Sequence, residues 1–107
     1  MDVVVTEVPE RHRFEARLNG SLAGHVEYAR LGGKILLTHT EVDGAFEGKG
    51  VGGELARTAL DSARANGLVV RPLCPFVAGW IRRHPDYVAL VDPIDRMRVM
   101  AAAKVAD

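Results

Sequence analysis

The stretch Gly48-Lys49-Gly50-Val51-Gly52-Gly53-Glu54-Leu55-Ala56-Arg57 decides the fold, because a glycine-rich loop there runs directly into an amphipathic helix. From residue 50 to 66 apolar residues recur every four positions with charged residues between them, which predicts a helix of about four turns. Asn66-Gly67 is typical of a left-handed C-cap that ends this helix. Branched apolar residues dominate both flanks, 34–42 and 68–73, so the three segments predict one βαβ unit with parallel strands and a right-handed crossover.

An antiparallel meander is expected before this unit, over residues 2–42. Asn19-Gly20 supplies the two positive-φ positions of a tight hairpin turn, and Gly32-Gly33 supplies the next turn. The strands expected in the meander cover residues 3–8, 12–18, 21–30 and 34–42.

Helices are expected after the βαβ unit. Residues 76–83 predict one helix, which ends before Pro85, and the tail over 92–107 is either a further helix or a frayed end. The fold class is therefore α+β, with a mixed sheet in which the antiparallel meander is followed by the βαβ unit and C-terminal helices. At about 150 residues per domain, a chain of 107 residues predicts a single domain over 1–107, with its core over 12–91.

The composition excludes several functional classes. Lys and Arg number 14 and Asp and Glu number 14, so the chain lacks the basic excess that binding to a nucleic acid backbone needs. Hydrophobic residues make up 48% of the chain, which is enough for a stable core. No apolar run approaches the roughly 18 residues of a membrane span, and the N-terminus lacks the features of a signal peptide. We therefore expect a soluble, cytoplasmic protein with no nucleic acid or membrane partner.

The cysteine and histidine content gives no indication of a metal site. Cys74 is the single cysteine, which excludes an internal disulfide and any zinc site built from several cysteines. His12, His25 and His84 show no ligand spacing with a second residue. No metal is expected.

A ligand site is expected at the carboxyl ends of the two parallel strands, where open sheets bind their ligands. The loop over 43–53 joins these ends to the helix, whose free N–H groups and positive dipole end attract phosphate, and Lys49 adds a positive charge. The alternative is that the glycines only make a turn and a close helix contact.

The loop does not match a Walker phosphate-binding motif, because Gly50 stands where Ser or Thr must hold magnesium. A dinucleotide fingerprint at 48–53 lacks the acidic residue and the chain length that such a fold needs.

Four ordered motifs carry a family resemblance: His39-Thr40-Glu41-Val42, Gly48-Lys49-Gly50-Val51-Gly52, Cys74-Pro75-Phe76-Val77 and Arg83-His84-Pro85-Asp86-Tyr87. Over residues 12–91 the chain resembles the GNAT superfamily of acetyl-CoA-dependent N-acetyltransferases, and within it a short, single-domain subfamily. The superfamily loop motif is Arg or Gln, two residues, Gly, one residue, then Gly or Ala, and its amides hold the CoA pyrophosphate. Glu47 departs from this motif, and Ile81 stands where the superfamily often places a Tyr as general acid.

The resemblance implies that acetyl-CoA is the cosubstrate and indicates which residues bind it. The strand backbone near Val42 would carry the pantetheine arm, and the loop would hold the pyrophosphate. The candidate cofactor-binding residues are Val42, Gly48, Lys49, Gly50, Val51, Gly52, Gly53, Pro75 and Phe76. The alternative for Phe76, as for Trp80, is a place in the core. Arg82-Arg83 is either a solvated helix face or a contact to the 3′-phosphate of CoA.

Cys74 precedes a proline, which predicts an N-cap with Pro75 as the first helical residue. Its thiol would then face the positive end of a helix, which favours the thiolate form. The alternative is a small buried apolar residue. The resemblance implies that Cys74 lies beside the thioester. There it would act either as a nucleophile that forms an acetyl-Cys74 intermediate or as an acid in direct attack by the amine.

His39 and Glu41 are two positions apart on one expected strand, so they share a face next to the opening between the parallel strands. Either side chain could take a proton from an attacking amine, because an alkyl amine with a pKa of about 10.4 arrives protonated. The alternatives are a hydrogen-bonded sheet histidine and a paired or hydrated carboxylate. Cys74, His39 and Glu41 are the candidate catalytic residues.

The residues and the resemblance together predict an N-acetyltransferase that moves an acetyl group from acetyl-CoA to an amine, as a monomer or weak homodimer. No recognisable motif names the acceptor amine. The alternative is a non-catalytic acyl-CoA-binding or interaction module on the same fold, which Glu47 and the missing Tyr favour.

Overall fold

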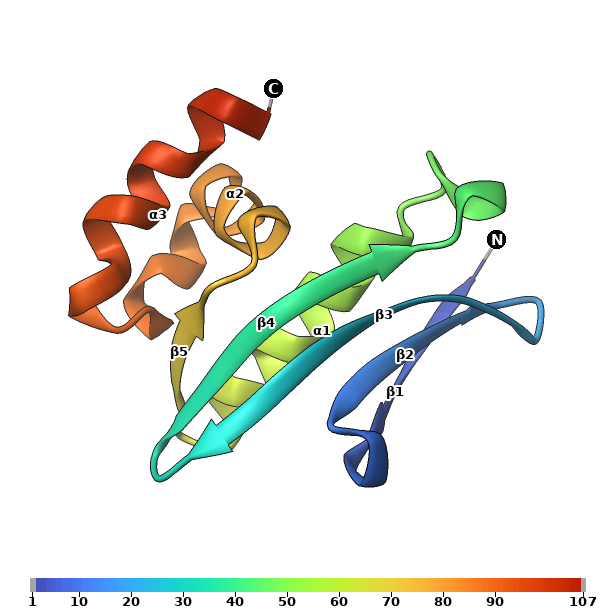
Figure 1. Cartoon of the computed structure of the whole chain (residues 1–107), viewed down its shortest axis with the longest axis horizontal. Helices are drawn as coiled ribbons and strands as arrows, with labels where there is room; N and C mark the ends of the chain where they lie inside the picture. The colour runs from blue at the N-terminus through green and yellow to red at the C-terminus, as the bar shows by residue number, and fades with distance from the viewer. Residues whose placement is uncertain (1, 107) are drawn as a thin grey trace.

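A computed structural model describes residues 2–106 as an α+β fold with one mixed sheet (Figure 1). The strands are β1 (Val3–Val8), β2 (Arg13–Leu18), β3 (Ser21–Leu31), β4 (Lys34–Val42) and β5 (Val69–Pro72). The helices are α1 (Val51–Ala65), α2 (Pro75–Arg83) and α3 (Pro93–Ala106), with short 3₁₀ helices η1 (Pro9–Arg11), η2 (Gly44–Phe46) and η3 (Pro85–Leu90). None of the described helices is both long enough and apolar enough to cross a membrane.

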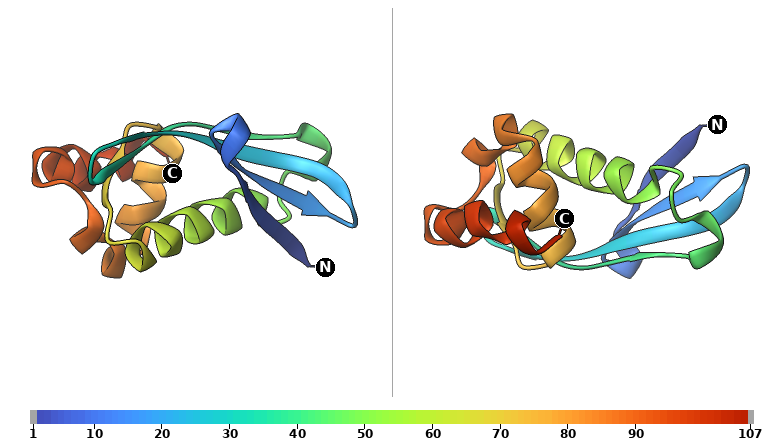
Figure 2. Two further views of the ribbon diagram at one scale, coloured as in Figure 1. Left: turned by 90° about the horizontal axis from the view of Figure 1, so that it is seen from below. Right: turned by 90° about the horizontal axis from the view of Figure 1, so that it is seen from above.

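The sheet has the strand order β1-β2-β3-β4-β5. Neighbours among the first four strands are antiparallel and β5 is parallel to β4, so the predicted meander and βαβ unit are confirmed. α1 and α2 lie over one face of the sheet, which we call the inner face, and none of the described helices covers the opposite, outer face (Figure 2). α3 lies beside α2 at the β5 edge (Figure 1).

Turn and cap residues adopt the conformations that their types predict. Asn19 and Gly20 have φ angles of 53° and 83°, and Gly67 has a φ of 65° just after α1. The strand expected from residue 12 begins one residue later, because His12 has a φ of 53° and closes η1. Of the two alternatives for the tail, the helix is confirmed, since α3 runs through it.

The hydrophobic core lies between the inner face and the helices. Leu55 and Leu60 of α1 are fully buried in one cluster with Phe14 of β2 and Leu37 of β4. Burial of each such side chain contributes about 1.5–3 kcal/mol. The core therefore fixes α1 on the sheet, and with it the glycine-rich loop that precedes the helix.

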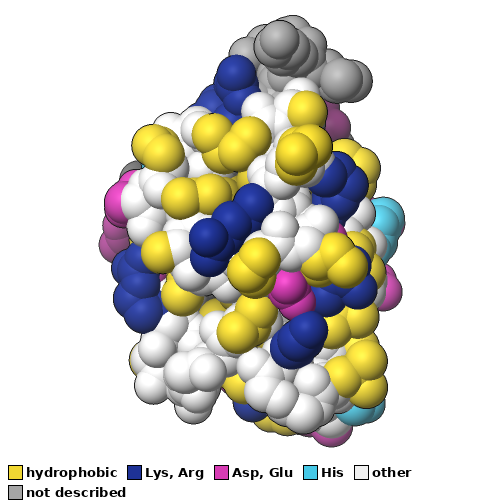
Figure 3. Space-filling model, turned by 90° about the vertical axis from the view of Figure 1, so that its left-hand side faces the viewer, with side chains coloured by type: hydrophobic (Ala, Val, Ile, Leu, Met, Phe, Trp, Pro, Cys, Tyr) yellow, Lys and Arg dark blue, Asp and Glu magenta, His cyan; other side chains and the backbone are white. Residues whose placement is uncertain are grey.

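Polar contacts attach α3 to the β5 edge. The guanidinium of Arg71 donates Nε and NH2 to the two carboxylate oxygens of Asp95, at 2.9 and 3.1 Å. Arg98 also contacts Asp95 and donates to the carbonyl of Pro72 at 2.9 Å. The hydrogen bond from Arg71 is the main cause that holds the pKa of Asp95 below its usual value. The surface on this side of the molecule is mixed, with apolar side chains between Lys and Arg (Figure 3).

Asp95→Asn is expected to lower the free energy of unfolding near pH 7 by about 1.5–3 kcal/mol, because it removes a buried charged acceptor. The folded-state pKa is depressed, so this contribution is present above the ordinary pKa of 3.8 and is lost as the pH falls through the folded value. Urea unfolding at about pH 7 and about pH 3 measures the effect, and the gap to wild type should narrow at the lower pH. Asp86→Asn, on an exposed carboxylate, is the control, and an equal loss there contradicts the prediction.

Candidate functional site

β4 and β5 separate at the end where the site was expected. The two strands pair only over residues 34–37 and 69–72. The backbone N–H groups of Leu73 and Cys74 then both donate to the carbonyl of Leu37, at 3.0 and 3.0 Å, and the proline that ends β5 has no N–H to extend the ladder. β4 therefore continues past Leu37 without β5 beside it, which leaves an opening between the strands.

A β-bulge in β4 determines which side chains face this opening. The register with β3 passes from Leu37 to His39 over two consecutive residues of β3, so Thr38 is an extra residue. A bulge of this kind reverses the alternation of side chains along the strand. Thr40 consequently points to the inner face, as Leu37 does, where it contacts Cys74.

A hollow of about 430 Å³ lies where β4, the glycine-rich loop, α1 and α2 meet. The predicted cofactor-binding residues are brought together in it, except Lys49 and Pro75, which do not line it. Three further lining residues, Thr40, Phe46 and Glu47, were not predicted to bind the cofactor. The full lining is Thr40, Val42, Phe46, Glu47, Gly48, Gly50, Val51, Gly52, Gly53 and Phe76.

The loop geometry fits an anion such as a phosphate group. Gly50 is the N-cap of α1 with a φ of 79°, and Glu54 N–H makes the first helical bond, to the Gly50 carbonyl at 3.1 Å. The N–H groups of residues 51–53 therefore have no carbonyl one turn earlier in the helix. A Cβ at Gly52 would lie 2.6 Å from Cζ of Phe76, so a side chain there would close the hollow. Together with the positive end of the helix dipole, these N–H groups and this space suit a phosphate.

Cys74 lies at the base of the opening. It is the N-cap of α2 in an extended conformation, with Pro75 at the first helical position, so the predicted cap is confirmed. The residue is 4% exposed, and its Sγ donates a hydrogen bond to Oγ1 of Thr40 at 3.2 Å. Since Thr40 also lines the hollow, the thiol is one side chain away from it.

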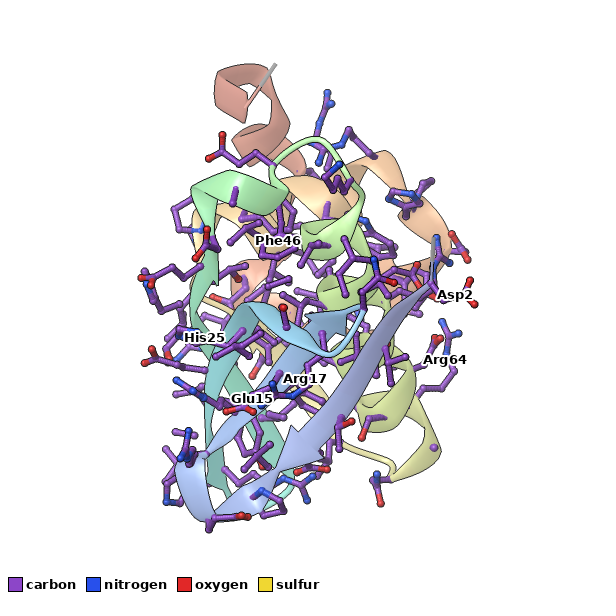
Figure 4. The ribbon with its side chains drawn as sticks, turned by 90° about the vertical axis from the view of Figure 1, so that its right-hand side faces the viewer. Asp2, Glu15, Arg17, His25, Phe46 and Arg64 are labelled. Atoms are coloured by element: carbon purple, nitrogen blue, oxygen red, sulfur yellow. The ribbon has the colours of Figure 1, made fainter. Side chains whose placement is uncertain are left out.

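His39 and Glu41 lie on the outer face. They share a face, as predicted, and Nε2 of His39 lies 3.3 Å from Oε1 of Glu41, with the two side chains 54% and 66% exposed. On β3 beside them, Nε2 of His25 lies 2.9 Å from Oε2 of Glu27. Figure 4 shows His25 on the outer side of β4 and Phe46 on the α1 side. The sheet therefore separates His39 and Glu41 from Cys74 except at the opening. Within residues 2–106, no group of three or more His, Cys, Asp or Glu side chains is placed to hold a metal.

The positions of three α2 side chains can be compared with the expectations for them. Phe76 is 39% exposed above Gly52, so the interpretation of Phe76 as a core residue is wrong. Helix α2 begins at Pro75, which turns Phe76 toward the loop, whereas Trp80 is buried in the core as expected. Nε of Arg82 donates to the carbonyl of Met100 at 2.6 Å, so this side chain is directed to α3.

Thr40 is a candidate site residue that sequence reasoning missed. Strict alternation along β4 puts Leu37, His39 and Glu41 on one face and Thr40 on the other. The bulge at Thr38 reverses this order of faces, and no residue type in the strand predicts a bulge there. Phe46 and Glu47 had a signal in the sequence, since they lie in the loop already assigned to phosphate.

Comparisons with known proteins identify the family of the chain. A family model described as GCN5-related N-acetyl-transferase matches residues 13–91. Protein NATD1 of Mus musculus is 33% identical over 88 residues, which cover 78% of this chain and 80% of the mouse protein. Protein NATD1 of Homo sapiens is 34% identical over 87 residues, which cover 78% of this chain and 77% of the human protein. The chain therefore belongs to the GCN5-related N-acetyltransferase family.

Proposed function

We propose that this chain transfers an acetyl group from acetyl-CoA to an amine. The observation that carries the proposal is the position of Thr40. This residue lines the glycine-rich hollow and also accepts the hydrogen bond of the Cys74 thiol, at 3.2 Å. A phosphate site and a buried thiol thus adjoin each other at one opening in the sheet.

Each part of acetyl-CoA has a counterpart among these residues. The N–H groups of the loop and of the first turn of α1 hold the pyrophosphate. The pantetheine arm follows the exposed backbone of β4 near Val42, where β5 no longer pairs. Phe76 covers the hollow from α2. The thioester then lies in the opening, beside Cys74.

The acyl transfer needs a proton acceptor for the amine and a proton donor for the leaving sulfur. Acetyl-CoA supplies an activated thioester. The amine nitrogen attacks its carbonyl carbon from the outer face, the carbon–sulfur bond breaks, and the Cys74 thiol gives its proton to the CoA sulfur. His39 or Glu41 takes the proton that the amine loses, directly or through water, and Cys74 regains a proton from solvent.

A non-catalytic acyl-CoA-binding module is the second candidate, and one observation favours it. Glu47 lines the hollow and places a negative charge close to the proposed phosphate site. Such a charge weakens CoA binding if it turns inward, which favours a module that binds acyl-CoA loosely, or serves in interaction alone, over an efficient enzyme.

Two measurements test the proposal. Native mass spectrometry of freshly purified protein should show retained CoA or acetyl-CoA. Incubation with acetyl-CoA and pooled amines, among them alkyl amines and lysine peptides, should release CoA in step with acetylated amine. Retention without transfer supports the binding module instead. The absence of both retention and transfer would contradict both candidates.

The double variant His39→Ala, Glu41→Gln is expected to lower turnover about fivefold to tenfold and to leave CoA affinity unchanged. Proton transfer by a positioned base commonly accelerates a reaction by more than tenfold. Here both side chains are exposed, so water can accept part of the protons in their place and the expected loss is smaller. Steady-state kinetics with saturating acetyl-CoA measures the effect. His25→Ala, on the same face, is the matched control. An equal loss in that variant assigns the effect to a general disturbance of this face rather than to proton transfer.

A further inference from the structure

Trp80 carries a polar group that the site described above does not use. The residue is 4% exposed, yet no described residue accepts a hydrogen bond from its indole Nε1. Among the described residues no side-chain nitrogen or oxygen is both fully buried and unpaired, so Nε1 reaches the surface. It does so beside Gly53, where a Cβ would lie 3.5 Å from Nε1. Because Gly53 lines the hollow, Nε1 of Trp80 lies beside the edge of the hollow, although Trp80 itself does not line it.

Neighbouring rings fix the direction of this N–H. The His84 ring stacks on the indole, with centroids 3.8 Å apart and planes 15° apart. Nδ1 of His84 lies 2.8 Å from the backbone carbonyl of Trp80, which holds the stack in place. Tyr87 meets the indole edge-on at 5.1 Å. A donor held in this way needs no reordering when a ligand accepts its hydrogen bond.

Arg57 places a positive charge beside the same ring. Its guanidinium carbon lies 5.3 Å from the centre of the Trp80 ring, and the side chain is 47% exposed. Two carboxylates lie near it on α1. Glu54 is 3.7 Å from Nε and 48% exposed, so the pair is weak, and Asp61 accepts a hydrogen bond from the Tyr87 hydroxyl at 2.8 Å. The hydrogen bond to Asp61 raises the pKa of Tyr87, and a contact from the Arg57 guanidinium to the same hydroxyl works against this rise. Because a guanidinium carries several N–H donors, these partners leave some of them available to an anion.

We propose that Trp80 Nε1 and the Arg57 guanidinium form a second phosphate subsite, which binds the 3′-phosphate on the ribose of CoA. This inference rests on the proposed function, because it takes the pyrophosphate to lie on the first turn of α1. Gly53 and Arg57 are one helical turn apart, about 6 Å along the axis, which corresponds to the span of a ribose between its two phosphates. Guanidinium groups suit phosphate oxygens, since they offer paired donors with a fixed charge.

The subsite also accounts for a glycine that the pyrophosphate does not require. The phosphate-binding motif of the resemblance ends at Gly52, whereas Gly53 follows it. A Cβ at position 53 would lie 3.5 Å from Nε1, in ordinary van der Waals contact, so a side chain longer than that of alanine would crowd the N–H. Gly53 thus leaves the indole donor open toward the ligand.

The test compares CoA with 3′-dephospho-CoA by isothermal calorimetry. Wild type should bind CoA about tenfold more tightly than the dephospho form. Arg57→Gln should remove most of this preference, by weakening CoA about tenfold and the dephospho form less than twofold. Trp80→Phe keeps an aromatic ring but loses the N–H, so it should weaken CoA severalfold and spare the dephospho form. Thermal unfolding confirms that each variant is folded.

Arg64→Gln is the matched control, because Arg64 lies on α1, covers the Tyr87 ring at 4.7 Å and is 49% exposed, but is two turns further from the hollow. It should leave both affinities unchanged. Equal weakening of both ligands by Arg57→Gln, or no preference in wild type, overturns the 3′-phosphate subsite while the proposed function stands. Absence of binding to either ligand overturns the proposed function, and the subsite with it.

Discussion

Cys74→Ala is expected to lower the rate of acetyl transfer by about 10²–10⁴-fold, with no acetylated enzyme at any stage of turnover. The thiol lies beside the opening and donates to Thr40 at 3.2 Å, so it is placed to protonate the leaving sulfur of CoA. The thioester of acetyl-CoA is already activated, and its exchange for a second thioester on Cys74 would gain little. Direct attack by the amine is therefore the expected route.

The covalent route makes different predictions for the same variant. Wild type mixed with acetyl-CoA alone would gain one acetyl group on Cys74, the kinetics would be ping-pong, and Cys74→Ala would lose nearly all activity. Intact-protein mass spectrometry of rapidly quenched mixtures separates the two routes. Detection of an acetyl-Cys74 species that forms as fast as turnover would show that direct attack is wrong.

A structural cysteine is the third possibility, and Cys74→Ser is the control for it. Serine keeps nearly the same size and can donate to Thr40, so the N-cap of α2 and the stability should be nearly unchanged. A serine hydroxyl is a far weaker acid than a thiol, so turnover should still fall. Near-normal turnover in both variants, with only a modest loss of stability in Cys74→Ala, would mean that Cys74 serves packing alone.

The elements that the sequence predicts well are those with local signals. α1 follows from apolar residues every four positions and from the left-handed Gly67 at its end, and the β2–β3 hairpin follows from Asn19-Gly20. The Cys74 cap follows from the proline after it. Each of these signals lies within a few residues of the feature that it predicts. The local preference and the tertiary packing therefore favour the same conformation.

The features that the sequence does not predict depend on contacts between distant segments. The bulge at Thr38 arises from the pairing of β3 with β4, and it moves Thr40 rather than His39 toward Cys74. The exposed position of Phe76 depends on how α2 meets the loop. The position of the Trp80 indole N–H beside Gly53 likewise depends on how α1 and α2 pack against each other. No pattern within one strand or one helix encodes these positions.

Gly50→Glu is expected to weaken the binding of CoA at least tenfold, which corresponds to about 1.4 kcal/mol. Gly50 is the N-cap of α1, and its position lines the hollow next to the N–H groups assigned to the pyrophosphate. A glutamate there adds bulk at the approach to these groups and a negative charge that repels phosphate. Calorimetric titration with CoA measures the affinity directly, without dependence on the unidentified acceptor.

The backbone strain of this substitution needs its own control, which the β2–β3 turn provides. Gly50 has a φ of 79° and Gly20 a φ of 83°, and neither has other atoms within 4 Å of where a Cβ would stand. A side chain in this left-handed conformation costs about 1–2 kcal/mol of stability at either position. Gly20→Glu should therefore match Gly50→Glu in stability loss and in added charge, but bind CoA as wild type does. If folded Gly50→Glu also kept wild-type affinity, the assignment of the pyrophosphate to this loop would be wrong, because the donors of the loop could not then be in contact with it.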